Sequence, residues 1–323
     1  MCDDPALSAE ALAALRSLGL SSTRRDSSSS SDSDEEEAQG GAAAAAAAAP
    51  PAVPPGASAA AGGAADAAAA YAMDADFMPK NNATYHEQGY WDARFEEEAE
   101  KEWLASFAQL ESLLRRFVAP SDRILMVGCG NSPFSQQMYA AGFENIHNID
   151  FSEVVVRKMA ARHAEDCPNM TWAVMDMTKI SAAAASFDVV LDKAAMDALM
   201  TAETDRWNPS AGCLQQGHDM CSGVARVLRR VRREPPAAEG EPPAADGATP
   251  PQPRGGVFLQ VSFDQPHFRK RFLLGPPAEE LGEAAPAGAG VSQEGELSAA
   301  YGWRLTKHDV EVGLGYFLYC MAF

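Results

Sequence analysis

Short apolar runs alternate with helically spaced apolar residues along the last three quarters of the chain. Five runs that each stop at a glycine or an aspartate predict strands, at 123–127, 145–149, 170–175, 187–191 and 257–263. Apolar residues at helical spacing predict helices, at 96–118, 135–141, 154–164, 196–200 and 217–230. Because strands and helices alternate, we expect a parallel sheet covered by helices on both faces.

The last two apolar segments, 303–312 and 316–322, flank the sequence Gly313-Leu314-Gly315 and predict a hairpin. A hairpin places an antiparallel strand at one edge of the sheet. The expected fold class is therefore α/β: a three-layer, Rossmann-like arrangement with a mostly parallel, seven-stranded sheet and an antiparallel edge strand.

Three segments lack any such apolar pattern. Residues 1–78 contain a serine and acidic run followed by alanine, glycine and proline, and residues 233–254 and 275–297 are rich in proline, alanine and glycine. Such segments cannot bury enough apolar surface to offset their chain entropy. We therefore predict a disordered, low-complexity tail over 1–78 and one domain over 79–323 with two disordered surface insertions.

Composition and charge exclude several classes of protein. The 323 residues carry a formal net charge of −19, which argues against a nucleic-acid binder that neutralises phosphates. No apolar run is long and bulky enough for a membrane span. The six cysteines form no CxxC pair, so neither a zinc site nor a disulfide framework is expected. The first residues lack a basic signal region, and we expect a cytoplasmic protein with no metal.

The loop after the first predicted strand is the first candidate site. Open α/β sheets bind ligands beyond the carboxyl ends of their strands, where the first loop is glycine-rich. Here that loop reads Gly128-Cys129-Gly130, and glycines at both positions let a backbone turn sharply and approach a ligand closely. A tight turn without a ligand is the alternative for so short a motif.

Acidic residues stand at the ends of the next three predicted strands. Asp150 follows the glycine loop by about 20 residues, where a carboxylate can accept both ribose hydroxyls of an adenosine. Asp176 can accept a hydrogen bond from an adenine amino group, and Asp192-Lys193 ends the fourth strand. Helix caps are the alternative for Asp150 and Asp176. Carboxylates at three strand ends exceed what caps require and favour an adenosine cofactor.

The choice of cofactor depends on the third position of the glycine motif. A dinucleotide fingerprint needs a glycine there, to seat a pyrophosphate at the start of the following helix. This chain has Pro133 at that position. A cofactor without phosphates therefore fits better, and this favours methyl transfer from S-adenosyl-L-methionine.

The sequence resembles a known family of enzymes. The cofactor loop within 123–132 is similar to that of the seven-strand S-adenosylmethionine-dependent methyltransferases. More narrowly, the chain resembles the group of elongation factor 1-alpha lysine methyltransferase 4 and the methyltransferase-like 13 proteins. The segments that carry this narrower resemblance are 90–95, 149–156, 175–177, 186–193, 196–199, 266–269 and 301–303. The resemblance implies a class I methyltransferase fold and S-adenosyl-L-methionine as cofactor.

The resemblance also implies which residues bind the cofactor. Phe95 stands where the family has a tyrosine, which removes a hydroxyl, and Asp192 stands where it has a glutamate. For Trp91 and Trp103, core packing is the alternative that the residues alone would favour. The cofactor-binding residues expected from the loop and the resemblance are Trp91, Phe95, Trp103, Gly128, Gly130, Asp150, Phe151, Asp176, Met177 and Lys193.

The expected function is protein-lysine N-methylation, with a protein similar to elongation factor 1-alpha as the partner. Methyl transfer needs positioning and water exclusion rather than a catalytic triad, and the sequence shows none. Candidates for the acceptor channel are Asp192, Asp197, Tyr90 and Trp91. The alternatives are a small-molecule methyltransferase on the same fold and a cofactor-binding scaffold without turnover. The acceptor residue and the oligomeric state stay open.

Overall fold

The computed structural model describes residues 79–231, 255–277, 280, 295–311 and 315–323. The predicted tail and the predicted insertion at 233–254 lie outside the described residues, as does most of 275–297. A helix with the length and apolarity that crossing a membrane requires does not occur in the described part of the chain.

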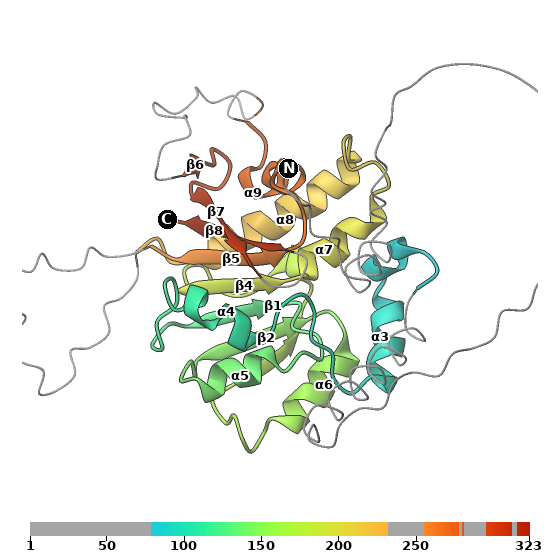
Figure 1. Ribbon diagram of the computed structural model, residues 1–323, viewed down its shortest axis with the longest axis vertical. Helices are drawn as coiled ribbons and strands as arrows, with labels where there is room; N and C mark the ends of the chain where they lie inside the picture. The colour runs from blue at the N-terminus through green and yellow to red at the C-terminus, as the bar shows by residue number, and fades with distance from the viewer. Residues whose placement is uncertain (1–78, 232–254, 278–279, 281–294, 312–314) are drawn as a thin grey trace, which may run out of the picture. The chain divides into compact units, whose positions relative to one another are not determined.

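An eight-stranded sheet forms the centre of the described chain, in the order β3-β2-β1-β4-β5-β8-β7-β6 (Figure 1). Strands β1 to β5 pair in parallel, and β8 runs antiparallel to both of its neighbours. The bounds are β1 Ile124–Val127, β2 Ile146–Asp150, β3 Thr171–Val174, β4 Val189–Lys193, β5 Val257–Ser262, β6 Glu296–Leu297, β7 Arg304–Val310 and β8 Tyr316–Ala322.

The predicted α/β, Rossmann-like fold class is confirmed, and two of its details are corrected. The hairpin does not end the sheet with its antiparallel strand, because β8 inserts between β5 and β7. The sheet also has eight strands rather than seven, because β6 pairs with β7. This short strand lies inside the segment 275–297 that the sequence assigned to an insertion.

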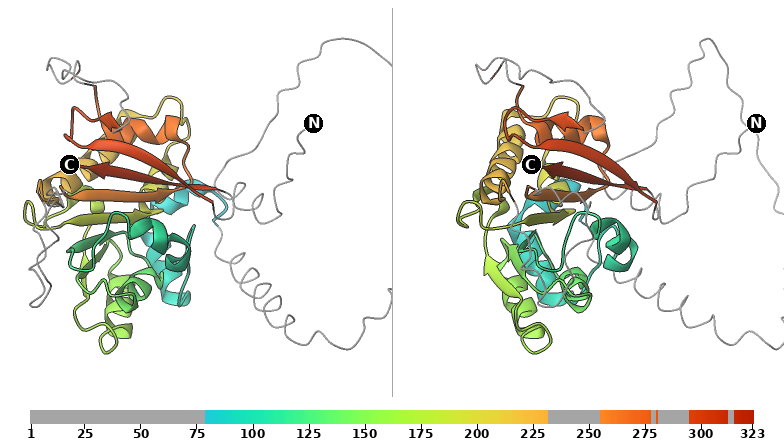
Figure 2. Two further views of the ribbon diagram at one scale, coloured as in Figure 1. Left: turned by 60° about the vertical axis from the view of Figure 1, so that its left-hand side comes forward. Right: turned by 90° about the vertical axis from the view of Figure 1, so that its left-hand side faces the viewer.

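Helices cover both faces of the sheet (Figure 2). Alternate residues of β1 divide between two cores: Leu125 and Val127 pack with α7, α8 and α9, whereas Ile124 and Met126 pack with α4 and α5. The bounds of the helices are η1 Asn82–His86, α3 Gln88–Glu97, α4 Phe107–Leu114, α5 Phe134–Ala140, α6 Glu153–Arg162, η2 Met177–Lys179, α7 Ala195–Leu199, η3 Met200–Ala202, α8 Ala211–Val227 and α9 Pro266–Leu274.

The single helix predicted over 96–118 is wrong. Two helices occupy this region, α3 and α4, and residues 98–106 between them are not helical. Ser106 starts α4 with a capping box, in which the side chain of Gln109 accepts a hydrogen bond from the Ser106 amide at 2.8 Å. Leu104 has a left-handed backbone, with φ of 63°. The apolar spacing continues across this break, which is why it suggested one helix.

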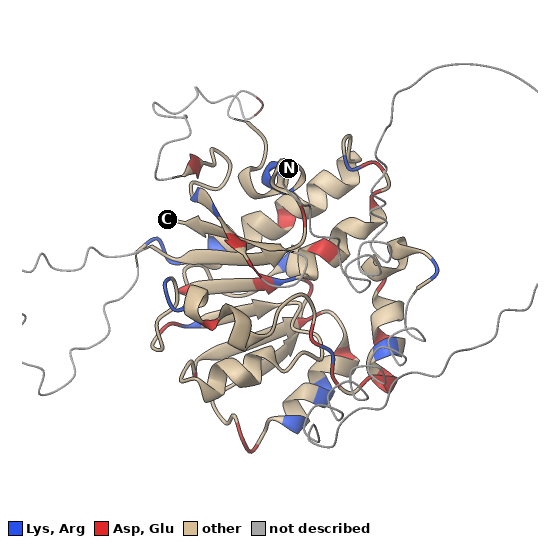
Figure 3. Ribbon diagram, in the orientation of Figure 1, with Lys and Arg blue, Asp and Glu red and all other residues tan. Residues whose placement is uncertain are grey.

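Helix α3 packs on α6 rather than directly on the sheet. Phe95 is buried in a small cluster with Val155, Val156 and Met159 of α6. Acidic residues on or just after α3 face basic residues of α6 (Figure 3). The clearest of these ion pairs joins Lys158 Nζ to Glu96 Oε2 at 2.8 Å. These contacts hold α3 near the carboxyl ends of the parallel strands, where the predicted site lies.

Candidate functional site

The glycine loop joins β1 to α5 and has an unusual backbone at both glycines. Gly128 and Gly130 have positive φ angles of 60° and 54°. A Cβ atom added to Gly128 would lie 2.4 Å from Cβ of Ala195, so the first turn of α7 packs directly on the loop. From the sequence, we expect a glycine here because a ligand approaches the backbone closely. The structure adds the close approach of α7 as a second reason.

Asp150 at the end of β2 supports the glycine loop. Its Oδ2 accepts a hydrogen bond from the Gly130 amide at 2.9 Å, and its Oδ1 accepts one from the Ser152 amide at 3.0 Å. Ser152, rather than Asp150, is the side-chain cap of α6. Asp150 is buried, and the loss of hydration raises the pKa of its carboxyl to about 6. The carboxylate keeps acceptor capacity for a further donor.

Residues 98–106, which we call the strap, cross from α3 to α4 and bind the glycine loop and β4. Asn131 Nδ2 donates to Oε2 of Glu98 at 3.0 Å, and the Ser132 hydroxyl donates to Oε1 of Glu102 at 2.9 Å. Lys193, the last residue of β4, is buried and forms an ion pair with the same oxygen of Glu102. Burial lowers the pKa of Lys193.

Backbone strain accompanies the contact between the strap and β4. Lys193 Nζ donates a hydrogen bond to the carbonyl oxygen of Trp103 at 2.9 Å. The residues that follow these two, Ala194 and Leu104, have φ angles of 70° and 63°, in the left-handed region that favours glycine. Such strain costs on the order of 1–3 kcal/mol per residue and gathers at functional sites.

Three of the four aromatic residues predicted to contact a cofactor lie together. Trp91 stacks on Phe95 with ring centroids 5.4 Å apart, and it meets Trp103 edge to face at 6.0 Å. The buried guanidinium of Arg94 lies 4.9 Å from the centre of the Trp103 ring and pairs with Glu98 at 2.6 Å. Trp91 and Trp103 are half-buried, so part of each residue stays accessible.

The predicted site residues that follow β2 and β3 make contacts that give less indication of a ligand. Asp176 caps η2, since its Oδ1 accepts from the amide and the hydroxyl of Thr178 at 2.8 Å each. This is the cap that the sequence left open as an alternative. Met177 is half-buried against the core that contains α7, α8 and α9. Phe151 is half-buried, and its carbonyl oxygen accepts a hydrogen bond from Gln88 of α3 at 2.8 Å.

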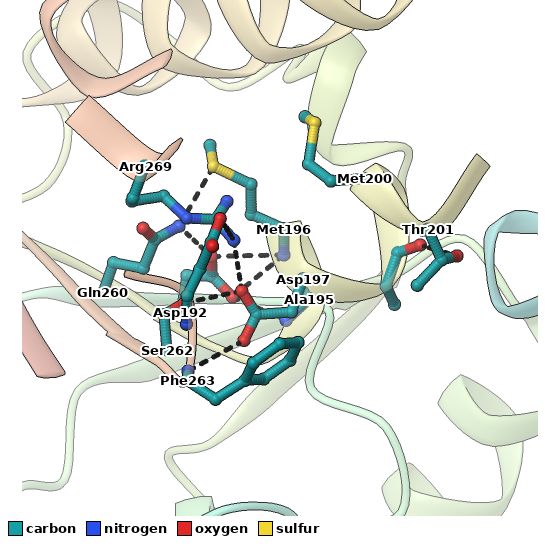
Figure 4. A network of polar contacts seen from close by, with 12 residues as sticks. Asp192, Ala195, Met196, Asp197, Met200, Thr201, Gln260, Ser262, Phe263 and Arg269 are labelled. Atoms are coloured by element: carbon teal, nitrogen blue, oxygen red, sulfur yellow. Dashed lines mark hydrogen bonds and ion pairs between the residues drawn. The ribbon is translucent and has the colours of Figure 1, made fainter. Parts of the chain in front are cut away.

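The candidate acceptor carboxylates are already engaged within the protein (Figure 4). Asp192 is fully buried and accepts hydrogen bonds from the Ala195 amide and from Gln260 Nε2, each at 2.8 Å. Asp197 accepts one from the Ser262 hydroxyl at 2.6 Å and pairs with the buried guanidinium of Arg269. Burial raises the pKa of both carboxyls, that of Asp197 to about 6.

Several residues of this region were missed by sequence reasoning. No motif marked the strap carboxylates Glu98 and Glu102, or Asn131, which donates to Glu98. Only the spacing of Arg94 and Glu98 by four residues hinted at a pair. Arg269 lay in a segment of family resemblance but received no role. Its partner Asp197 lies 72 residues away, so no local pattern could show this pair.

The geometry of the loop fits S-adenosyl-L-methionine. Asn131 Oδ1 and Glu102 Oε2 are buried acceptor atoms without a hydrogen-bond partner in the described part of the chain. These acceptors suit the ammonium group of a methionine moiety, and the remaining acceptor capacity of Asp150 suits ribose hydroxyls. A pyrophosphate fits poorly, because the Ser132 hydroxyl already accepts a hydrogen bond from the first amide of α5 at 3.1 Å.

Comparison with known proteins gives the same class. A family model described as "Methyltransferase domain" matches residues 124–208. EEF1A lysine methyltransferase 4 of Mus musculus is 34% identical over 197 residues, which cover 60% of this chain and 68% of that protein. The eEF1A lysine and N-terminal methyltransferase of Xenopus laevis is 39% identical over 155 residues, but these cover 47% of this chain and only 22% of that protein.

Among solved structures, a SAM-dependent methyltransferase from Aquifex aeolicus is 16% identical and has a TM-score of 0.40. The match covers 72% of this chain and 97% of that one. The sequence matches, the fold and the glycine loop define the class: the protein is an S-adenosylmethionine-dependent methyltransferase. Within this class, the chain belongs to the family of EEF1A lysine methyltransferase 4. The predicted family and the predicted cofactor are thereby confirmed.

Proposed function

We propose that the protein transfers a methyl group to the side-chain amine of a lysine in a partner protein similar to elongation factor 1-alpha. The observation that carries this proposal is the 34% identity to mouse EEF1A lysine methyltransferase 4, which extends over 68% of that relative. A partner of this kind makes the cytoplasm the expected location. The relatives are named for a protein substrate, and this favours a protein over a small molecule as acceptor.

Bound S-adenosyl-L-methionine supplies an electrophilic methyl group on a sulfonium centre. In our proposal Asp150 accepts the ribose hydroxyls, and Gly128 and Gly130 let the loop backbone approach the ligand. Asn131 and Glu102 offer their unpaired acceptor atoms to the ammonium group. We also assign to the cofactor pocket five further residues that the sequence predicted, because they lie close to this loop or because the family resemblance implies the contact: Trp91, Phe95, Trp103, Phe151 and Met177.

Lys193, Asp176, Asp192 and Asp197 act indirectly in this proposal. Lys193 fixes the strap over the loop, and Asp176 fixes the turn after β3. Asp192 holds the first turn of α7, whose Ala195 contacts Gly128, and Asp197 holds α7 to α9. A lysine acceptor must lose its proton before transfer, and a channel lined by half-buried aromatic side chains lowers its pKa by desolvation.

Cofactor affinity is expected to depend on the ionisation of Asp150. The pKa of this carboxyl in the folded protein is about 6, so it is ionised at pH 8 and loses its charge as the pH falls below 6. A neutral carboxyl gives up lone pairs that accept hydroxyl donors. The dissociation constant of S-adenosylhomocysteine, measured by calorimetry, should be flat from pH 7 to 9 and rise by up to about tenfold per pH unit below 6.

The isosteric Asp150→Asn variant is the control for this pH dependence. It should bind the ligand more weakly at pH 8 and show little change between pH 8 and pH 5. If the wild type and Asp150→Asn have the same pH profile, Asp150 is not the titrating group and its role at the ribose is wrong.

The proposed function is tested with purified elongation factor 1-alpha and labelled S-adenosylmethionine. We expect label on the elongation factor, located on lysine side chains by mass spectrometry, and at least a tenfold lower rate with Asp150→Ala. Label that enters only small molecules of a cell extract would replace this proposal by small-molecule methylation. Ligand binding without transfer to any acceptor would identify a scaffold.

A further inference from the structure

Three aromatic side chains form a cluster on the surface beyond β4 and β5. Trp207 is 68% exposed, the largest exposed fraction among the large apolar side chains of the described chain. Its ring stacks on the ring of His267, with centroids 5.4 Å apart and planes 23° apart, and meets the ring of Phe268 edge to face at 4.8 Å. We call Trp207, His267 and Phe268 the aromatic platform.

The platform lies on the same edge of the sheet as the cofactor loop. Trp207 belongs to the loop that follows α7 and η3 and therefore the carboxyl end of β4. His267 and Phe268 stand in the first turn of α9, just beyond the carboxyl end of β5. Helix η3 packs against η1, whose Tyr85 contacts Trp91 and Trp103. The protein thus links the platform through η3 and η1 to the aromatic residues of the proposed pocket.

The platform is held in place despite its exposure. The Trp207 carbonyl oxygen accepts a hydrogen bond from Arg271 of α9 at 3.0 Å. The Trp207 amide donates to Oδ1 of Asp205 at 2.9 Å. Arg269 of the same helix is anchored to Asp197 in α7, so α9 cannot shift without disturbing a buried ion pair. An ordered exposed tryptophan loses little entropy on binding a partner, which suits a recognition surface.

The charges around the platform favour a cationic partner. Asp205 is exposed and Glu203 is half-buried, and both carboxylates are held by backbone amides of the Trp207 loop. Of the neighbouring cations, Arg206 pairs with Asp264 and lies over the Phe268 ring at 4.8 Å, and Arg271 donates to the Trp207 carbonyl. The face of Trp207 therefore has no cation of the described chain over it, whereas Phe268 has one. Tryptophan is the best aromatic acceptor for a cation, whereas flanking carboxylates oppose the docking of a purely apolar segment.

We propose that the aromatic platform docks a lysine- or arginine-bearing segment of the protein substrate, outside the residue that is methylated. A substrate cation would rest on Trp207 and face the carboxylates of Asp205 and Glu203. This inference rests on the proposed protein-lysine methylation and adds the surface that selects the protein. It also explains why an exposed tryptophan stacks on one ring and meets a second edge to face instead of standing alone.

Steady-state kinetics of the full chain with elongation factor 1-alpha test the platform. Removal of one desolvated contact between a cation and Trp207 should raise KM for the protein substrate by about 3- to 30-fold in Trp207→Leu. The turnover number and the affinity for S-adenosylhomocysteine should stay within about twofold of the wild type. The KM of Trp207→Phe should fall between those of the wild type and Trp207→Leu. Asp205→Asn should raise KM and make KM depend less on the salt concentration.

Controls separate docking from folding and from the proposed function. Val231, which is 61% exposed at the end of the described segment after α8, provides Val231→Ser as a matched loss of exposed apolar surface with no expected change in KM. An unchanged KM in Trp207→Leu, with transfer by the wild type intact, would overturn the platform alone. Equal KM values in Trp207→Leu and Trp207→Phe would overturn the cationic partner. No transfer by the wild type would instead overturn the proposed function and, with it, the platform.

Discussion

Gly128→Ala is expected to abolish measurable cofactor binding and to lower the melting temperature by on the order of 10 °C. The new Cβ would lie 2.4 Å from Cβ of Ala195, where neither partner has a flexible end that can move away. A left-handed backbone adds about 1–2 kcal/mol for any residue with a Cβ, and overpacking adds about 1–3 kcal/mol. This overlap can be removed only if the loop or α7 shifts. A shift of the loop disturbs the hydrogen bond between the Gly130 amide and Asp150.

Gly142→Ala is a matched control for this prediction. Gly142 also has a positive φ, of 97°, but nothing lies within 4 Å of the position of an added Cβ. This variant should lose only the backbone part of the stability, a few degrees in melting temperature, and bind S-adenosylhomocysteine as the wild type does. Calorimetry and thermal melting of both variants measure the difference. Normal ligand affinity in Gly128→Ala would show that the loop does not form the cofactor site.

The parallel strands could be predicted from sequence because each is marked locally. Strands β1 and β4 are buried on both faces, so each appears as an unbroken apolar run closed by a glycine or an acidic residue. The run of β5 is interrupted only by Gln260, whereas β2 has His147 and Asn148 between its two isoleucines. The break between α3 and α4 could not be found in this way. It depends on the capping box at Ser106 and on contacts of the strap with the glycine loop, and neither changes the apolar spacing.

The candidate site likewise contains contacts that the local sequence predicts and contacts that it does not. Gly128, Gly130 and Asp150 are separated by at most 22 residues, and the order of strand, loop and strand fixes their meeting at one edge of the sheet. The strap contacts and the pair of Asp197 with Arg269 join residues 30 to 91 positions apart. Polar side chains over such separations leave no periodic pattern, so only the fold reveals which of them meet.

Arg269→Met is expected to destabilise the protein by about 3–5 kcal/mol, because it leaves a buried carboxylate without its cation. Arg269 is 1% exposed and pairs with Asp197 and, at 3.1 Å, with Asp264. Asp264 keeps Arg206 as a partner, whereas Asp197 keeps only neutral donors. Thermal melting should show a drop of about 10–20 °C. The exposed pair of Arg157 and Glu96 gives the control, since Arg157→Met should cost less than about 1 kcal/mol.

The loss in Arg269→Met should shrink as the pH falls. Burial already raises the pKa of Asp197 to about 6 in the presence of the cation, and removal of the cation raises it further. The folded carboxyl then binds a proton more readily than the unfolded one, whose pKa is about 3.9, so acid favours the folded variant in this interval. The melting temperature of the variant should therefore lie closer to that of the wild type at pH 5.5 than at pH 8.

The double variant Asp197→Asn with Arg269→Met is the control for this pH dependence. It should recover part of the stability at pH 8 and lose the pH dependence, because no buried charge is left unpaired at Asp197. A gap between Arg269→Met and the wild type that is the same at both pH values would mean that Asp197 is not the group whose charge Arg269 balances.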